Sequence, residues 1–201
     1  MTAINPQIYE SLAGLLEYPE ADWIAQLENS RRLVVSENAD LAIDFLRFYK
    51  NVIPFTLSSL QELYTQTFDL NPTCALEVGY HLFGENYKRG ELLASLRETE
   101  SPYSIGQQHQ LPDYLPVLLR LIVRLNDAEL RQSLISECIL PALRKMTDEL
   151  SKGANPYRDL LKAVRGALKV EAPEIETPAL PAGWERAESM PELYRISSLR
   201  K

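Results

Sequence analysis

The chain has 201 residues, of which 45% are hydrophobic and 24% charged, enough to bury the core of one globular domain. Its net charge of -7 argues against binding to nucleic acid, because phosphate binding needs clustered Lys and Arg. No apolar run is long enough to span a membrane, and the N-terminus lacks the basic and then apolar order of a signal peptide. Cys74 and Cys138 lie far apart in the sequence without metal-ligand spacing, so we expect a cytoplasmic protein with free thiols.

Helical signals follow one another through the first third of the chain. A cap followed by proline at 5–6 starts a first helix, and Tyr-Pro at 18–19 ends it and starts a second. Apolar spacing predicts a third helix over 37–51, which is broken by a proline soon afterwards. In the fourth helix Ser59 stands three residues before Glu62, the spacing of a capping box.

The middle of the chain continues in the same way. Asn-Pro at 71–72 opens a fifth segment over 73–83, and Gly84 is placed to end it. A sixth helix is predicted over 87–98. Residues 99–110 carry Ser, Pro, Gly and Gln with little apolar content, so we expect a surface loop there.

The stretch 111–125 is the most apolar in the sequence, and its spacing predicts the central helix of a bundle. Pro116 lacks an N–H and fits only the first turn, which makes Asp113 the expected N-cap. Asp113 should lie with Arg120 and Arg124 on a narrow polar strip. One broad apolar face is formed by Leu115, Leu118, Leu119, Ile122 and Leu125.

Helical spacing also describes the remainder of the bundle. A long pattern over 127–150 should be kinked or split where Pro141 removes a backbone donor. Asn-Pro at 155–156 starts one more short helix. No segment alternates apolar and polar residues long enough to predict a strand.

We therefore predict an all-α protein with a single-domain helical bundle over 1–170 and a proline-rich tail over 171–201. Four prolines exclude continuous helix from the tail. Trp184 and Tyr194 could dock the tail on the bundle, and disorder is the alternative.

A search for catalytic motifs finds no zinc-protease, Cys-x-x-Cys or dinucleotide-binding pattern. Two glycines have phosphate-loop spacing, but Glu85 and Asn86 follow where Lys and Ser or Thr are needed. His81 lies four residues after Glu77, so the two could form an acid–base pair, or His81 could be a half-exposed, salt-bridged side chain. We predict no enzymatic activity, no cofactor and no metal site.

A series of distinctive residues runs from Tyr64 to Pro116. It contains Phe68-Asp69, a helix from Glu77 to a glycine, Arg89-Gly90, and Leu-Pro-Asp-Tyr-Leu-Pro at 111–116. This series resembles the delta-type assembly chaperones of respiratory nitrate reductase and related molybdenum enzymes. They form part of the wider clan of maturation chaperones that bind twin-arginine-type leaders. The resemblance extends over roughly 9–165 in helix order.

Two positions depart from the pattern of that family. Tyr114 stands where the family usually has His, and Gln110 stands where it often has Glu. The first difference removes a titrating imidazole from this position.

The resemblance implies an all-helical, non-enzymatic protein, and we expect a monomer. Such a chaperone binds the N-terminal segment of a molybdopterin-containing catalytic subunit in the cytoplasm until the cofactor is inserted. We expect an apolar groove beside Tyr64, Tyr114 and Val117. The resemblance and the charge pattern together give the candidate partner-binding residues Tyr64, Phe68, Asp69, Glu77, His81, Arg89, Leu111, Pro112, Asp113, Tyr114, Pro116, Val117, Arg120 and Arg124.

Several of these residues also have a purely structural interpretation. Phe68 lies on the core stripe of its helix, whereas the hydroxyl of Tyr64 could equally reach a groove. Asp69 could cap the following turn. Asp113 could act only as an N-cap, because capping already satisfies its carboxylate.

The basic candidates have alternatives as well. Arg89 could be a solvated charge, and Gly90 could mark a close helix crossing. Arg120 and Arg124 could pair with Asp113 or with acidic groups on another helix. The rival functions are an adaptor with an unrelated partner and a helical bundle that binds a small molecule or a nucleotide.

Overall fold

The computed structural model describes residues 4–37, 39–105 and 110–172. All regular elements within these ranges are helices, which confirms the all-α prediction, and one isolated bridge pairs Glu77 with Tyr114. The predicted tail begins two residues too early, because Glu171 still belongs to the last described helix and Ala172 is its C-cap. The rest of the tail, from 173 onward and including Trp184 and Tyr194, lies outside the described residues.

Four helices form the N-terminal part of the fold. As predicted, Asn5 caps the first of them by accepting the N–H of Gln7 at 3.0 Å. The fourth begins before the expected capping box, so the prediction for Ser59 is wrong. Thr56 is extended and its Oγ1 accepts the N–H of Ser59 at 3.2 Å, whereas Ser59 is already helical. The helices are α1 (Pro6–Leu15), α2 (Trp23–Glu37), α3 (Ala39–Val52) and α4 (Leu57–Tyr64).

Six further α-helices follow within residues 39–105 and 110–172. Gly84 ends α5 with a φ of 60°, a conformation that favours glycine, as the sequence predicts. The last helix runs for 15 residues and is longer than expected. Their bounds are α5 (Val78–Phe83), α6 (Tyr87–Glu100), α7 (Leu115–Ile122), α8 (Ala128–Ser133), α9 (Leu140–Leu150) and α10 (Tyr157–Glu171).

Shorter helical turns connect these elements. Residues Pro72–Cys74 and Ser101–Tyr103 form 3₁₀ turns, and residues Thr65–Asp69 and Leu134–Ile139 form π-helical turns. The fifth predicted helix, 73–83, is therefore wrong in its first half, where a 3₁₀ turn ends at Cys74 and residues 75–77 are not helical.

The second π-helical turn explains the effect of Pro141. Proline has no N–H to donate to the carbonyl group four residues earlier. Just before Pro141 the helix widens into a π turn, in which the N–H of Leu140 donates to the carbonyl of Ile135. The predicted kink or split is confirmed in the form of α8, the π turn and α9 in direct succession.

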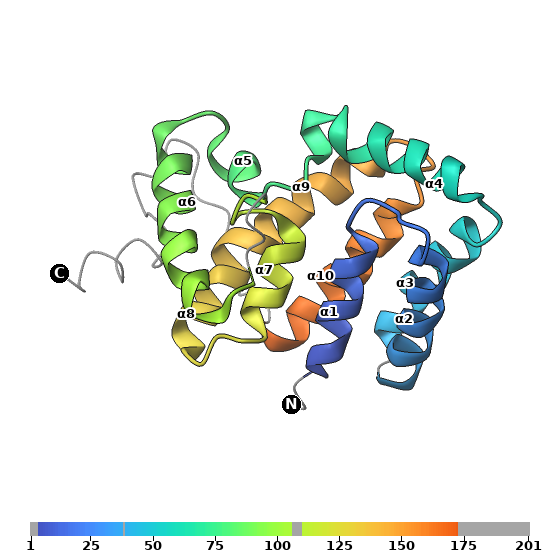
Figure 1. Ribbon diagram of the computed structural model, residues 1–201, viewed down its shortest axis with the longest axis horizontal. Coiled ribbons are helices and arrows are strands. Elements are labelled where there is room, and N and C mark those ends of the chain that lie inside the picture. The colour runs from blue at the N-terminus through green and yellow to red at the C-terminus, as the bar shows by residue number, and fades with distance from the viewer. Residues whose placement is uncertain (1–3, 38, 106–109, 173–201) are drawn as a thin grey trace, which may run out of the picture.

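The helices are arranged in two layers with flanking elements (Figure 1). Helices α1 and α7 pack side by side in one layer, and α9 and α10 pack together behind them. Helices α2 and α3 lie on one flank, where α3 packs against α10, and α5, α6 and α8 lie on the other.

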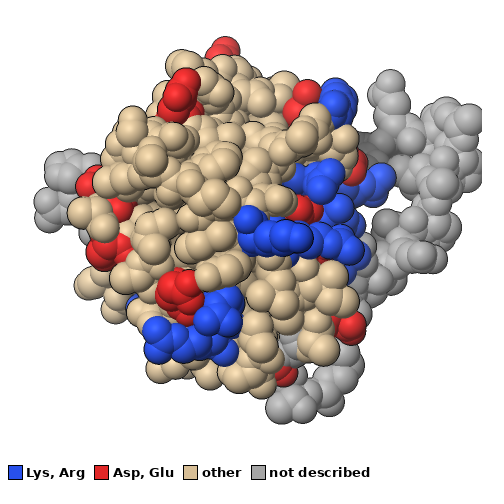
Figure 2. All heavy atoms as spheres, turned by 90° about the vertical axis from the view of Figure 1, so that its right-hand side faces the viewer, with Lys and Arg blue, Asp and Glu red and all other residues tan. Residues whose placement is uncertain are grey.

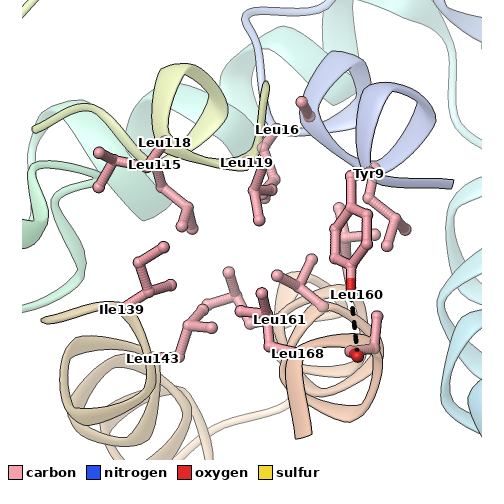
Figure 3. Packing of buried hydrophobic residues seen from close by; sticks show 14 of the residues in the cluster. Tyr9, Leu16, Leu115, Leu118, Leu119, Ile139, Leu143, Leu160, Leu161 and Leu168 are labelled. Atoms are coloured by element: carbon pink, nitrogen blue, oxygen red, sulfur yellow. Dashed lines mark hydrogen bonds between the residues drawn. The ribbon is translucent and has the colours of Figure 1, made fainter. Parts of the chain in front are cut away.

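The core fills the space between these layers (Figure 3). The broad apolar face predicted for α7 is buried throughout, which confirms its central position. Each fully buried leucine of this kind contributes about 1.5–3 kcal/mol relative to an exposed one. Tyr9 reaches across from α1 to α10, where its hydroxyl donates to the carbonyl of Ala167 at 3.0 Å. Cys74 and Cys138 are free and buried, as the sequence indicates.

The charged surface is mixed. Figure 2 shows the side of the molecule that carries α3 and α4, where the basic side chains occur in small groups with acidic side chains next to them. No helix in the described part of the chain is long and apolar enough to cross a membrane.

Candidate functional site

The site is organised by two short extended segments that lie against each other. The N–H of Val78 donates to the carbonyl of Asp113 at 2.8 Å, and the N–H of Leu115 donates to the carbonyl of Leu76 at 2.8 Å. The N-termini of helices α5 and α7 therefore lie next to each other. Pro116 sits in the first turn of α7, as predicted, and its missing N–H leaves no helical bond unmade.

Asp113 does not cap α7, so the prediction of an N-cap is wrong. Tyr114 occupies the N-cap position, without a side-chain capping bond. The carbonyl of Asp113 accepts from Val78, and its Oδ2 lies beside Gly79, so the residue is held against α5. Asp113 is fully buried, and its Oδ2 accepts from Nε of Arg89 at 3.1 Å.

The structure corrects the interpretations of Arg89 and Gly90 as well. Arg89 is not a solvated charge, because it pairs with Asp113 and its guanidinium lies 5.7 Å from the ring centre of Tyr80. Gly90 is not at a close crossing, since a Cβ there would meet nothing within 4 Å. Gly79 is the glycine at a close approach, because a Cβ there would lie 2.7 Å from Oδ2 of Asp113.

A buried and a partly buried carboxyl group share this corner. Burial raises the pKa of Asp113, while the charge of Arg89 beside it acts in the opposite direction. Burial also raises the pKa of Glu77, and the nearby charge of Asp113 adds to that rise. The single guanidinium thus stabilises a carboxylate that its surroundings disfavour.

A second cluster joins α1, α4 and the segment before α7. The hydroxyl oxygens of Tyr64 and Tyr114 lie 3.0 Å apart, and the carbonyl oxygen of Leu16 lies 3.2 Å from the first and 3.3 Å from the second. Two hydroxyl protons are available for three contacts, so two of the three bonds form at once. Burial raises the pKa of Tyr114 to about 12 and also raises that of Tyr64, so both remain protonated donors.

Aromatic packing holds the ring of Tyr64 in place. Its ring meets Phe68 edge-on with ring centres 5.0 Å apart, and Phe68 meets Tyr157 of α10 at 4.8 Å. Both interpretations of Tyr64 therefore apply, because its ring packs against Phe68 and its hydroxyl lies beside that of Tyr114.

Two open hollows meet at this tyrosine pair. One of about 410 Å³, here called the acidic hollow, is bordered by the connection between α1 and α2, and includes Glu17, Tyr18, Glu20, Asp22, Trp23 and Gln26. The other, of about 580 Å³ and called the apolar hollow, includes Phe68, Pro72, Ala75, Leu76, Glu77, Tyr80, Glu85, Arg89 and Leu111. Both are lined by Tyr64, Asp69 and Tyr114, so together they form one groove.

The first π-helical turn shapes the border between the hollows. Thr67 donates to the carbonyl of Leu63 at 2.6 Å and accepts from the side-chain amide of Asn155 at 2.7 Å. The wider turn carries Phe68 and Asp69 to the groove. Asp69 does not cap the following turn, because Asn71 does so.

Seven of the fourteen predicted site residues line the groove, and the others do not. Pro112, Asp113 and Pro116 are buried beside it and support its wall. The prediction that the groove lies beside Val117 is wrong, because Val117 is fully buried and α7 packs into the core around most of its circumference. The seven residues are Tyr64, Phe68, Asp69, Glu77, Arg89, Leu111 and Tyr114.

His81 makes neither of the contacts predicted for it. Its Nε2 donates to the carbonyl of Ala75 at 2.6 Å, and burial lowers its pKa. Glu77 cannot share a helix face with it, because Glu77 stands at the N-cap position and α5 begins one residue later.

Arg120 and Arg124 both pair with Glu10 of α1, and Arg120 also pairs with Glu17 just beyond the end of α1. Pairing with an acidic group on another helix is thereby confirmed, and pairing with Asp113 is wrong. Arg120 binds Glu17 at 2.7 Å and Glu10 at 3.1 Å, and Arg124 binds Glu10 at 2.6 Å. These pairs join α7 to α1 and hold the edge of the acidic hollow in place.

Sequence reasoning missed the contribution of residues 17–26. Three carboxylates lie within this short stretch, which could have marked it as an unusual surface. Nothing in its spacing, however, indicates that it lies next to Tyr114. In the described ranges, no group of three or more His, Cys, Asp or Glu could hold a metal ion.

Comparisons with known proteins bear on what this groove is for. No family model matches the chain. A probable nitrate reductase molybdenum cofactor assembly chaperone NarJ from Bacillus subtilis is 28% identical over 172 residues, covering 84% of this chain and 92% of that protein. A probable chaperone of this description from Escherichia coli, NarW, is 25% identical and covers 79% of this chain. NarJ from Escherichia coli is 28% identical and covers 73%.

The chain spans 66% of NarW and 63% of NarJ from Escherichia coli. The sequence resemblance to nitrate reductase assembly chaperones is confirmed by these homologues. They are named as chaperones of molybdenum cofactor assembly and not as enzymes, in agreement with the prediction of a non-enzymatic protein.

Proposed function

We propose that this protein is a cytoplasmic assembly chaperone that binds the N-terminal segment of a molybdopterin-containing, nitrate reductase-like catalytic subunit. It holds this segment in the groove until the cofactor is inserted, before the enzyme is attached to a membrane or exported. The observation that carries the proposal is a groove that combines apolar walls with carboxylates at the tyrosine pair. The names of the homologous proteins support the class of partner.

The chemistry of the groove suits an amphipathic segment. Leu111 is 46% exposed and offers apolar surface in the apolar hollow, whereas Phe68 and Leu76 line it with only 4% and 2% exposure. The carboxylates along both hollows attract basic residues. Charge complementarity speeds encounter and orients the segment, while burial of apolar side chains provides most of the affinity. The fixed tyrosine pair means that little ordering of the groove is needed on binding.

Co-purification with the catalytic subunit tests this function. Tagged protein should capture the full-length subunit and fail to capture a subunit that lacks its N-terminal segment. An adaptor would bring down a different protein, and an enzyme nothing large. Equal capture of the truncated and full-length subunits would contradict the proposed binding mode.

Matched tyrosine variants localise the binding. Tyr114→Ala should weaken capture by about 30-fold, since a partly buried interface aromatic typically contributes 2 kcal/mol or more. Tyr87→Ala removes an exposed tyrosine at the start of α6, outside both hollows, and should leave capture unchanged. If the two variants behave alike, the groove is not the binding surface.

A further inference from the structure

The two hollows differ in how their charges are neutralised. In the acidic hollow, Glu20, Asp22 and Asp69 make no ion pair with any residue in 4–37, 39–105 or 110–172, whereas Glu17 is held by Arg120. The hollow therefore presents negative charge that the described part of the protein does not neutralise.

The apolar hollow also carries carboxylates, those of Asp69, Glu77 and Glu85. Its one basic residue, Arg89, is already paired with Asp113 on the far side of its wall. Burial and the charge of Asp113 both favour the protonated form of Glu77 there. Most of its remaining lining is aromatic or aliphatic. This hollow suits apolar side chains better than a charged one.

Trp23 supplies an independent observation in the acidic hollow. It lines the hollow and is only 1% exposed, yet its indole N–H has no acceptor among the described residues. A buried donor without a partner is unfavourable, so an occupant that brings an acceptor oxygen recovers part of the lost free energy. An occupant that carries both a cation and a carbonyl oxygen matches this combination, and a basic residue of a peptide has both.

We propose that the acidic hollow is a subsite for one arginine or lysine side chain of the bound segment. The carboxylates of Glu20, Asp22 and Asp69 receive the cation, and the indole N–H of Trp23 donates to a backbone carbonyl of the segment. The segment crosses the contact between Tyr64 and Tyr114 and places apolar side chains in the apolar hollow. This inference rests on the proposed function and specifies the orientation of the bound peptide.

Calorimetry with a neutralised peptide series tests the subsite. The probe is a synthetic N-terminal peptide of the nitrate reductase catalytic subunit from the same organism, in which each arginine becomes citrulline and each lysine norleucine, one at a time. One of these replacements should weaken binding by about 10-fold, the scale of a charge-assisted contact in a partly solvated site. Asp22→Asn should weaken binding of the unmodified peptide by a similar factor.

Combining the protein variant with the neutralised peptide shows whether Asp22 contacts the critical charge of the peptide. Asp22→Asn should have little additional effect on the peptide that lacks the critical charge, because the interaction is already lost. Asp148→Asn on α9, outside both hollows, is the matched control and should leave affinity unchanged. In a Trp184→Phe background, Trp23 is the only tryptophan, and its emission should change when the peptide binds.

The results separate the two proposals. If the wild-type protein binds the peptide but no neutralisation weakens binding, or Asp22→Asn behaves like Asp148→Asn, the subsite is overturned and the proposed function stands. An unchanged Trp23 emission with tight binding overturns the role of the indole. If the wild-type protein does not bind the peptide at all, the proposed function itself fails.

Discussion

Replacing Asp113 with alanine should lower the free energy of unfolding by about 3–5 kcal/mol, as expected when one partner of a buried ion pair is removed. The Asp113 side chain is fully buried and Arg89 is 21% exposed, so the guanidinium would be left without a partner and mostly out of water. Space would also open against Gly79, which lies next to the carboxylate. Urea denaturation followed by circular dichroism measures the change.

Two comparisons make this result specific. Adding Arg89→Met to Asp113→Ala should recover part of the lost stability, because the unpaired charge is removed along with its partner. Asp148→Ala, at an exposed position on α9, should change stability by no more than about 0.5 kcal/mol. If Asp113→Ala costs less than about 1 kcal/mol, the ion pair between Asp113 and Arg89 does not stabilise the fold as described.

The second large effect is expected at Gly79. An alanine there would place its Cβ 2.7 Å from Oδ2 of Asp113 and 3.1 Å from Cδ2 of Leu92. The carboxylate cannot move away without lengthening its bond to Arg89, so we expect a loss of about 1–3 kcal/mol from overpacking. Thermal unfolding gives the change in stability, and peptide affinity should fall as the wall of the apolar hollow shifts.

Gly90 provides the control for this substitution. It lies within α6, and a Cβ there would meet nothing within 4 Å. Gly90→Ala should therefore stabilise the protein by roughly 0.5–1 kcal/mol, because alanine favours helix and has less freedom in the unfolded chain. If Gly79→Ala is also neutral or stabilising, the packing described around Asp113 is incorrect.

Local sequence signals account for most of the helices. The apolar spacing of 115–125 predicts the burial of α7, and Pro141 predicts the position at which the long helix is interrupted. Both features depend on backbone geometry within one segment. The π-helical form of the interruption could not be predicted, because it depends on how the neighbouring layers pack.

Predictions failed where a contact between distant segments decided the outcome. Asp113 has the sequence position of an N-cap, but pairing with the segment before α5 turns its side chain towards Arg89. Arg120 lies on the polar strip of α7, as its spacing indicates, yet only the packing of α1 against α7 shows that its partners are Glu10 and Glu17.

The candidate site was predicted in part. The distinctive residues from Tyr64 to Tyr114 do meet around the apolar hollow, although they are spread over several helices. The acidic hollow was not foreseen, because nothing in the sequence places residues 17–26 next to Tyr114, whose hydroxyl contacts the carbonyl of Leu16 just before this stretch. Val117 was misplaced because a helix that is apolar around most of its circumference gives no sign of which side meets solvent.

Isothermal titration of the catalytic subunit's N-terminal peptide into the full chain measures whether the protein binds this peptide. We expect a dissociation constant in the micromolar range or tighter, which corresponds to about 8 kcal/mol or more of binding free energy. A scrambled peptide of equal composition should bind much more weakly, and so should the correct peptide with Tyr114→Ala. Absence of binding heat at several temperatures, from folded wild-type protein and the correct subunit's peptide, would contradict the account.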